Sequence, residues 1–279
     1  YGGNFDPITS RHLQLATEVV HTGQVDEVWI CPTGPRPDLP QLASPSQRLA
    51  MCEIAVNQCT SPTTPIRVVD HEVREASLVG PDGTVATYDS LVYLREHHPG
   101  CDICFLVGAD KVGHIASWGS QQGRTGERIF EEFEILVQPR PGFEVDFARY
   151  ASRRVTPLRL PSGFAMAESN GESREVRKRA MREWSSERQG GNNMAALNGL
   201  VAPGVLAFIV RHRIYEPPGL PPLPPRASKK KVALVGGAFS PFSARFTYDG
   251  GHFSINRSRS WAVPSRPSPR RTCASRAKL

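Results

Sequence analysis

The sequence predicts an α/β protein with a doubly wound parallel sheet, in which helices cover both faces of the sheet. Short apolar segments typical of strands alternate with amphipathic helical segments as far as about residue 216. Several of the predicted strands run directly into a glycine turn or a proline-rich loop, which is where ligands collect in parallel sheets. The chain has 279 residues and is 39% hydrophobic, so it is long enough to bury a core.

The predicted elements follow one another along the chain. The expected strands are residues 25–31, 66–69, 104–107 and 133–137, and the expected helices are residues 10–22, 44–58, 87–97, 174–188 and 203–213. The expected inward-facing side chains are Leu13, Ala16 and Val20, then Leu49, Cys52 and Val56, and finally Val205, Leu206, Ile209 and Val210. The clearest helix start is Ser44-Pro45-Ser46-Gln47, which has a Ser cap, Pro at the first helical position and Gln three residues after the cap.

The clearest functional signal lies in residues 1–12, which read YGGNFDPITSRH. Two glycines allow the backbone to approach a ligand closely. Thr9 and His12 are three residues apart and therefore share one face of the first helical turn. Free amide groups at a helix N-terminus, together with a hydroxyl and an imidazole, indicate a phosphate site.

Charge is divided unevenly along the chain. The net charge is +7, but residues 226–279 hold 12 Lys or Arg and one acid, whereas residues 1–225 have a net charge of −4. A basic tail can bind nucleic acid or anionic lipid without specificity. Its Ser, Arg and Pro content favours a solvated, disordered tail, so we expect no specific nucleic-acid partner.

The domain organisation follows from composition. We expect a folded domain in residues 1–216, a proline-rich linker in residues 217–230, a strand and glycine turn in residues 231–242 that repeat the opening turn, and a disordered low-complexity tail in residues 243–279.

The spacing of the cysteines and the hydropathy of the chain indicate the cellular compartment in which we expect the protein. No apolar run approaches the roughly 18 residues that a membrane span needs, and no signal segment precedes the first helix. The six cysteines are irregularly spaced, and Cys101-Asp-Ile-Cys104 lacks the second pair that a zinc site needs. We expect reduced thiols and a cytoplasmic protein.

With these segments identified, residues 1–216 resemble the nicotinate/nicotinamide mononucleotide adenylyltransferases, which carry a (H/T)xGH signature on a Rossmann-like fold. The matching segments are GGNFDPITSRHL at 2–13, SPSQRLAM at 44–51, TYDSL at 87–91, FLVGAD at 105–110 with Trp118 after it, VQPRPG at 137–142 and VAPGVLAFIVRHRIY at 201–215. One GGxFxP turn alone is weak evidence, but six segments in this order are specific.

The resemblance implies a reaction of NAD biosynthesis. The phosphate of nicotinate or nicotinamide mononucleotide would attack the α-phosphorus of ATP, and pyrophosphate would leave without a covalent enzyme intermediate. Such chemistry depends on positioning and on neutralising charge. Mg²⁺ would be held mainly by the ATP phosphates and water, with no protein metal site.

The resemblance also implies residue roles. His12 and Thr9 would donate to the α-phosphate and Arg177 would bind the β- and γ-phosphates. The remaining expected binding residues are Gly2, Gly3 and Phe5 for phosphate and mononucleotide, Gly108 and Asp110 for adenosine and its ribose, Thr87, Tyr88 and Trp118 near the pyridine ring, and Ser173. Plainer explanations stay open: Thr9 and Asp110 as helix caps, Trp118 as core, and Arg177 as part of a basic helix face.

Several positions depart from the family pattern. Thr9 stands where this branch usually has His, and Arg11 replaces the signature glycine. The loop segment Arg36-Pro-Asp-Leu-Pro-Gln lacks the usual Lys, and Arg36 is the cation available to replace it. In the segment ESREVR at 172–177, Arg174 takes the place of a Thr.

The strand that should precede the first helix is missing, and its loss leaves buried backbone groups unpaired at about 1–3 kcal/mol each. Residues 231–242, KVALVGGAFSPF, have the sequence expected of that strand and turn. Four explanations stay open: a second truncated catalytic unit, a segment that folds back, a segment that swaps between chains of a homo-oligomer, or a gene fragment.

Two other functions compete with the leading one. The first is another nucleotidyltransferase of the same superfamily, such as one acting on phosphopantetheine, although residues 87–91, Trp118 and the last helix argue against it. The second is an inactive, degenerate copy whose basic tail binds a partner.

Overall fold

The computed structural model describes residues 1–80, 82–119, 126–161, 172–187, 194–219, 246–249 and 252–255. Contacts divide the chain into two compact units, Tyr1–Pro224 and Pro225–Leu279. The predicted linker and the repeated strand and turn at 231–242 lie almost entirely outside the described residues.

Six strands of the first unit form two parallel, three-stranded sheets. The first sheet has the order β1 (Gly2–Gly3), β2 (Val28–Pro32), β3 (Ile66–Val68), and the second has the order β4 (Cys104–Gly108), β5 (Glu134–Gln138), β6 (Val155–Pro157). All four pairings are parallel, which confirms the predicted α/β class.

The first strand is present only as the short β1. Gly2 pairs with Cys31 and Gly3 with Pro32. The Tyr1 backbone extends this ladder: its amine donates to the Trp29 carbonyl at 2.9 Å, and its carbonyl accepts the Cys31 amide at 3.0 Å. No ladder joins β1 to β4 among the described residues, so the two sheets stay separate.

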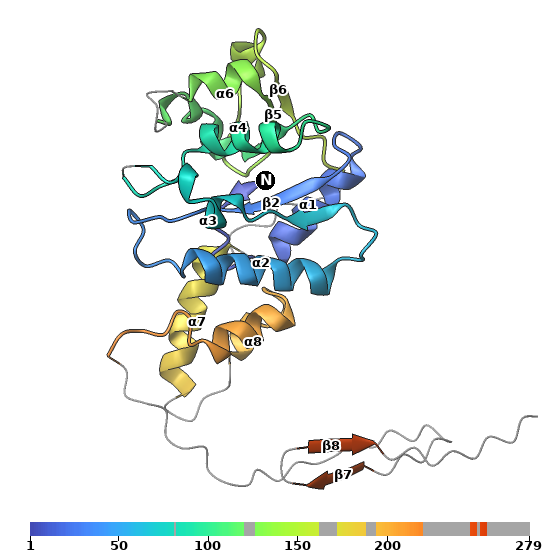
Figure 1. Ribbon diagram of the computed structural model, residues 1–279, viewed down its shortest axis with the longest axis vertical. Helices are drawn as coiled ribbons and strands as arrows, with labels where there is room; N and C mark the ends of the chain where they lie inside the picture. Colours follow the sequence, from blue (N-terminus) through green and yellow to red (C-terminus); the bar gives the residue numbers. More distant parts are fainter. Residues whose placement is uncertain are drawn as a thin grey trace, which may run out of the picture. The chain divides into compact units, whose positions relative to one another are not determined.

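Helices lie between the strands in the chain and pack around them. Their bounds are α1 Ser10–His21, α2 Pro45–Cys59, α3 His71–Arg74, α4 Thr87–His97, α5 Ala109–Val112, α6 Glu127–Glu132, α7 Ser173–Glu187 and α8 Pro203–Arg211. Figure 1 shows α7 and α8 side by side next to α2, while α4 and α6 lie with β5 and β6 at the other end of this unit. The start of α2 is as predicted, because the Ser44 hydroxyl accepts the Gln47 amide and the Gln47 side chain accepts the Ser44 amide.

Two apolar clusters form the core. The larger contains residues of α1, α2, β2, α7 and α8, and the smaller lies around β4, β5 and α4. The last helix departs from the predicted pattern at one position. Val205 and Ile209 are fully buried, but Val210 is 39% exposed because it lies one residue, or about 100°, further round the helix than Ile209.

In the second unit the structure describes two short strands within the predicted low-complexity tail. β7 (Phe246–Asp249) pairs with β8 (His252–Ile255) in an antiparallel ladder from Phe246↔Ile255 to Asp249↔His252. Gly250 and Gly251 separate the two strands in the sequence, and Gly-Gly between aromatic and β-branched residues is a hairpin signal.

Trp184 is the side chain whose replacement tests this packing most directly. It is 1% exposed on α7, and its indole Nε1 donates to the Ile214 carbonyl at 2.9 Å beyond the end of α8. We expect Trp184→Phe to lower the free energy of unfolding by about 2 kcal/mol, because it opens a void and leaves that carbonyl unpaired. Urea unfolding measures the change. Val210→Ala, on the exposed face of α8, is the control and should leave stability within about 0.5 kcal/mol of the wild type.

Candidate functional site

A cavity of about 2260 Å³ reaches the carboxyl ends of β1, β2, β4 and β5 and extends as far as the residues that precede β2 and β4. It is lined by the turn after β1, the loop after β2 and the residues that follow β4 and β5. Ten of the twelve residues expected from the sequence line it, namely Gly2, Gly3, Phe5, His12, Thr87, Gly108, Asp110, Trp118, Ser173 and Arg177. Thr9 and Tyr88 are the two that do not.

Thr9 fixes the orientation of the His12 ring through contacts to Nδ1. The Thr9 backbone amide donates to His12 Nδ1 at 2.9 Å, and the Thr9 hydroxyl lies 3.0 Å from the same nitrogen. Because Nδ1 accepts the amide hydrogen, the neutral imidazole carries its proton on Nε2. Thr9 is 1% exposed and caps α1, so it orients the donor rather than reaching the cavity itself.

The imidazole of His12 is neutral in the free protein. Burial, followed by the positive charge of Arg140, lowers the pKa of His12 to about 4. The Phe5 ring packs edge-on against His12 at 5.2 Å between centroids. Phe5 itself has φ of 45°, a backbone conformation that a bulky residue rarely adopts and that is held here by its burial.

Asp6 joins the opening turn to three distant segments. Its Oδ1 accepts the Tyr215 hydroxyl at 2.8 Å and the Ala43 amide at 3.1 Å. Arg177 Nη1 donates to the Asp6 carbonyl and lies 3.4 Å from Asp6 Oδ2. The Ser173 hydroxyl donates to the Pro7 carbonyl at 2.8 Å, so both matched residues of α7 contact this turn.

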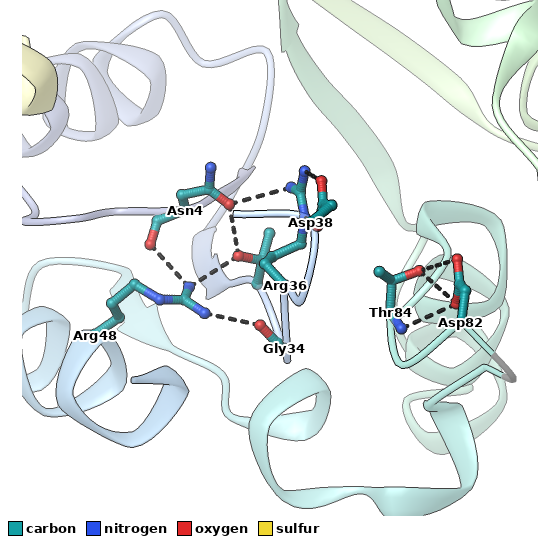
Figure 2. Close-up of polar contacts among 8 residues, drawn as sticks. Asn4, Gly34, Arg36, Asp38, Arg48, Asp82 and Thr84 are labelled. Carbon is teal, nitrogen blue, oxygen red and sulfur yellow. Dashed lines mark hydrogen bonds and ion pairs between the residues drawn. The ribbon is translucent and has the colours of Figure 1, made fainter. Parts of the chain in front are cut away.

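Arg48 fixes the turn and the loop after β2 to each other. Figure 2 shows its guanidinium between the carbonyl oxygens of Asn4 and Gly34. Nη1 donates to Asn4 O at 3.0 Å and to Thr33 Oγ1 at 2.8 Å, Nη2 donates to Gly34 O at 2.7 Å, and Nε donates to Ala43 O at 3.1 Å. Arg48 is 1% exposed, so these bonds replace water around a buried cation.

Arg36 is the cation of that loop. It pairs with Asp38 through two bonds of 2.8 and 2.6 Å, and its Nη1 lies 3.3 Å from Asn4 Oδ1 (Figure 2). The pair with Asp38 raises the pKa of Arg36 further above its ordinary value. The guanidinium is therefore placed beside the opening turn with a fixed orientation.

A side chain at Gly108, the last residue of β4, would displace two neighbouring side chains. A Cβ on Gly108 would come within 2.5 Å of Asp110 Oδ1 and 2.8 Å of Arg140 Nε. Asp110 and Arg140 form an ion pair of 3.0 Å across the ends of β4 and β5. The carboxylate expected to hold a ribose is thus neutralised by a neighbouring cation.

Thr87 and Tyr88 face different ways. Thr87 lines the cavity at the start of α4, whereas Tyr88 is 3% exposed in the smaller core and donates its hydroxyl to Glu132 at 2.7 Å. The two side chains leave α4 about 100° apart, and of the two only Thr87 lines the cavity. The structure thus does not bring the Tyr88 ring to the cavity lining, and its place near a pyridine ring stays a prediction. Trp118 lines the cavity and contacts Phe105 edge-on at 6.3 Å.

Comparisons with known proteins agree with this geometry. A family model described as Cytidylyltransferase-like matches residues 1–179. A protein of Leifsonia xyli named as a probable nicotinate-nucleotide adenylyltransferase is 30% identical over 216 residues, covering 77% of this chain and 92% of its own length. The chain belongs to the nicotinate-nucleotide adenylyltransferase family.

Two further similarities support that assignment. The probable nicotinate-nucleotide adenylyltransferase of Tropheryma whipplei strain Twist is 31% identical over 217 residues, covering 77% of this chain and 97% of its own length. The nicotinic acid mononucleotide adenylyltransferase of Plasmodium falciparum, solved in complex with NaAD, has a TM-score of 0.59 at 23% identity and covers 77% of this chain and 95% of its own. The latter likeness shows that this family member has the same fold.

Four buried or paired residues of this adenylyltransferase were missed by the sequence reasoning: Asp6, Arg48, Glu72 and Arg140. Asp6 and Arg48 lie inside matched segments and were quoted there without a role. A charged residue inside a helix normally indicates a solvated face, so the sequence gave no sign that Arg48 is buried. Glu72 lies outside every matched segment, and only the structure places its carboxylate at the cavity.

Two negative findings concern the described part of this family member. No group of three or more His, Cys, Asp or Glu side chains there is arranged to hold a metal ion. Among the helices described, none combines the length and apolar character that a membrane crossing requires.

The tautomer and charge of His12 can be tested directly. We expect the imidazole of the free adenylyltransferase to keep its proton on Nε2 and to stay neutral from pH 8 down to about 5.5, because its pKa of about 4 lies well below the ordinary value. Histidine ¹⁵N NMR at a series of pH values measures both. Arg140→Gln should raise the midpoint, since it removes the second cause of the shift. A midpoint near the ordinary value in the wild type would contradict this arrangement.

Proposed function

We propose that this protein transfers the adenylyl group of ATP to nicotinate mononucleotide, giving the dinucleotide and pyrophosphate. The observation that carries the proposal is the Nε2–H of a neutral His12, presented at the N-terminus of α1 inside the cavity. A helix N-terminus favours an anion, and a fixed neutral donor can bond to a phosphate oxygen as negative charge develops there. Nicotinate is the first acceptor to test because the relatives are named for it.

The other residues of the cavity support the same reaction. Arg177 and Arg36 supply cations on either side of the opening turn, and Gly2 and Gly3 allow the backbone to approach a phosphate. Asp110 lies at the end of β4, where parallel sheets bind nucleotides, and is placed to accept a ribose hydroxyl. These groups position two substrates for in-line displacement and require no covalent intermediate.

We propose that Mg²⁺ enters with the nucleotide. The acids that line the cavity near the turn are engaged already, Asp38 with Arg36, Asp110 with Arg140, and Asp6 with Arg177. This donor set fits an ion that keeps most of its ligands from phosphate and water. The ion would neutralise charge on the leaving pyrophosphate.

We also place the protein in the cytoplasm or another reducing compartment. The five cysteines in the described residues are free, and burial raises the pKa of Cys31 and Cys52, which keeps both thiols protonated. Unreacted buried thiols are usual in such a compartment.

One assay tests the activity. Incubation with ATP, Mg²⁺ and each of nicotinate mononucleotide, nicotinamide mononucleotide and phosphopantetheine should release pyrophosphate with a pyridine mononucleotide only. Release with phosphopantetheine alone would replace the proposed function by the related one. No release with any acceptor, from protein that unfolds cooperatively, would indicate an inactive copy.

The role of His12 has a sharper test. We expect His12→Ala to lower kcat by about 100-fold or more, because a donor to the developing charge is lost. His21→Ala is the matched control, since His21 is exposed at the other end of α1, and it should leave kcat unchanged. A His12→Ala rate within about threefold of the wild type would reject the assigned role.

A further inference from the structure

Glu72 is a buried carboxylate at the cavity to which neither the matched segments nor the reaction assigns a role. It is 9% exposed on the short helix α3 and lines the cavity together with Ser90 of α4. Burial raises its pKa, while bonds from Ser90 and Gly34 and the charges of Arg48 and Arg36 act in the opposite direction. A buried acid of this kind needs hydrogen-bond donors, and two of them define what it does.

The first donor belongs to the loop after β2. The Gly34 amide donates to Glu72 Oε2 at 3.1 Å, and on its other side the Gly34 carbonyl accepts Arg48 Nη2 at 2.7 Å. Gly34 is therefore held through its amide by the buried carboxylate of Glu72 and through its carbonyl by the buried guanidinium of Arg48. Gly34 also has no space for a side chain, because a Cβ would lie 2.3 Å from the Glu72 carbonyl oxygen and 2.9 Å from Val85.

The second donor fixes the orientation of the carboxylate. The Ser90 hydroxyl donates to Glu72 Oε1 at 2.7 Å, and His71 Nε2 lies 2.7 Å from the same hydroxyl. Because Ser90 gives its only hydrogen to Glu72, it accepts one from His71, whose ring is neutral since burial lowers its pKa to about 4. The ring also stacks on Tyr93, with 5.5 Å between centroids and an interplanar angle of 8°. These contacts hold the Glu72 carboxylate in one orientation, in which Oε1 accepts the Ser90 hydroxyl and Oε2 accepts the Gly34 amide.

The loop that Gly34 begins carries Arg36 over the cavity. Arg36 lies two residues beyond Gly34 and contacts Asn4 of the opening turn. A displacement of the Gly34 peptide would be transmitted to this guanidinium through two residues, of which Pro35 has a fixed φ. The position of a cation near the phosphates consequently depends on the reach of the Glu72 side chain.

We propose that Glu72 is a positioning residue for adenylyl transfer: it fixes the Gly34 amide and so places the loop at residues 33–43, with Arg36, for ATP. This inference rests on the proposed function. This role requires a side chain long enough to bring an acceptor oxygen to the Gly34 amide. A role for the negative charge alone would not depend on that length, so the two roles predict different outcomes.

Two conservative variants separate these roles. Glu72→Gln keeps the length and an acceptor for Gly34 but removes the charge, whereas Glu72→Asp keeps the charge and withdraws the acceptor by one methylene. We expect Glu72→Asp to raise the KM for ATP at least about fivefold, with the KM for the mononucleotide within about twofold, and Glu72→Gln to keep both constants within about twofold of the wild type. Amide hydrogen exchange at Gly34 should accelerate in Glu72→Asp alone.

Each other outcome overturns the proposal. If Glu72→Gln is impaired and Glu72→Asp is not, the charge matters and the positioning role fails. If both variants are less stable to urea but keep the KM values and the Gly34 exchange rate of the wild type, Glu72 is only structural. Wild-type protein that shows no turnover would reject the proposed function, while the exchange measurement would still report whether Glu72 holds the loop.

Discussion

The site depends above all on one buried cation, Arg48. Its guanidinium bonds to backbone oxygens of the opening turn and of both ends of the loop after β2, segments that share no ladder at those positions. Each of those carbonyls would otherwise be buried without a donor or would need water. Since removal of one partner from such a network leaves the rest unsatisfied, the turn and the loop hold their shape together or lose it together. A residue of helix α2 thereby determines the geometry of a cavity that it does not line.

Electrostatic balance is a second property of the cavity. Three of its cations, Arg36, Arg140 and Arg177, each face a carboxylate of the chain. Paired in this way they keep fixed positions without a ligand and without the mutual repulsion that clustered cations would have. A triphosphate bound as we propose would exchange partners with these carboxylates and would not need to order free side chains.

Whether a contact in the fold or the site could be predicted from the sequence depends on how far apart its two residues lie in the chain. The capping box at Ser44 and Gln47 was predictable because both partners lie within one helical turn. The opening turn and the position of His12 in the first turn of α1 were predictable because glycine and helix-start chemistry are local. Val210 was misplaced because spacing identifies a helix more securely than it identifies which of two adjacent residues faces inward. Arg48, Asp6 and Glu72 were missed because their partners lie tens to hundreds of positions away, where no sequence spacing constrains them.

The hydrogen bond between Asp6 and Tyr215 has a consequence for biosynthesis. The two residues are 209 positions apart, and the carboxylate that accepts this bond also lies 3.4 Å from Arg177 Nη1 through its Oδ2. Until Tyr215 has been synthesised, the Asp6 carboxylate lacks this donor. A truncated product that ends before Tyr215 therefore cannot complete the hydrogen bonds that hold the opening turn, even though every residue of that turn is present.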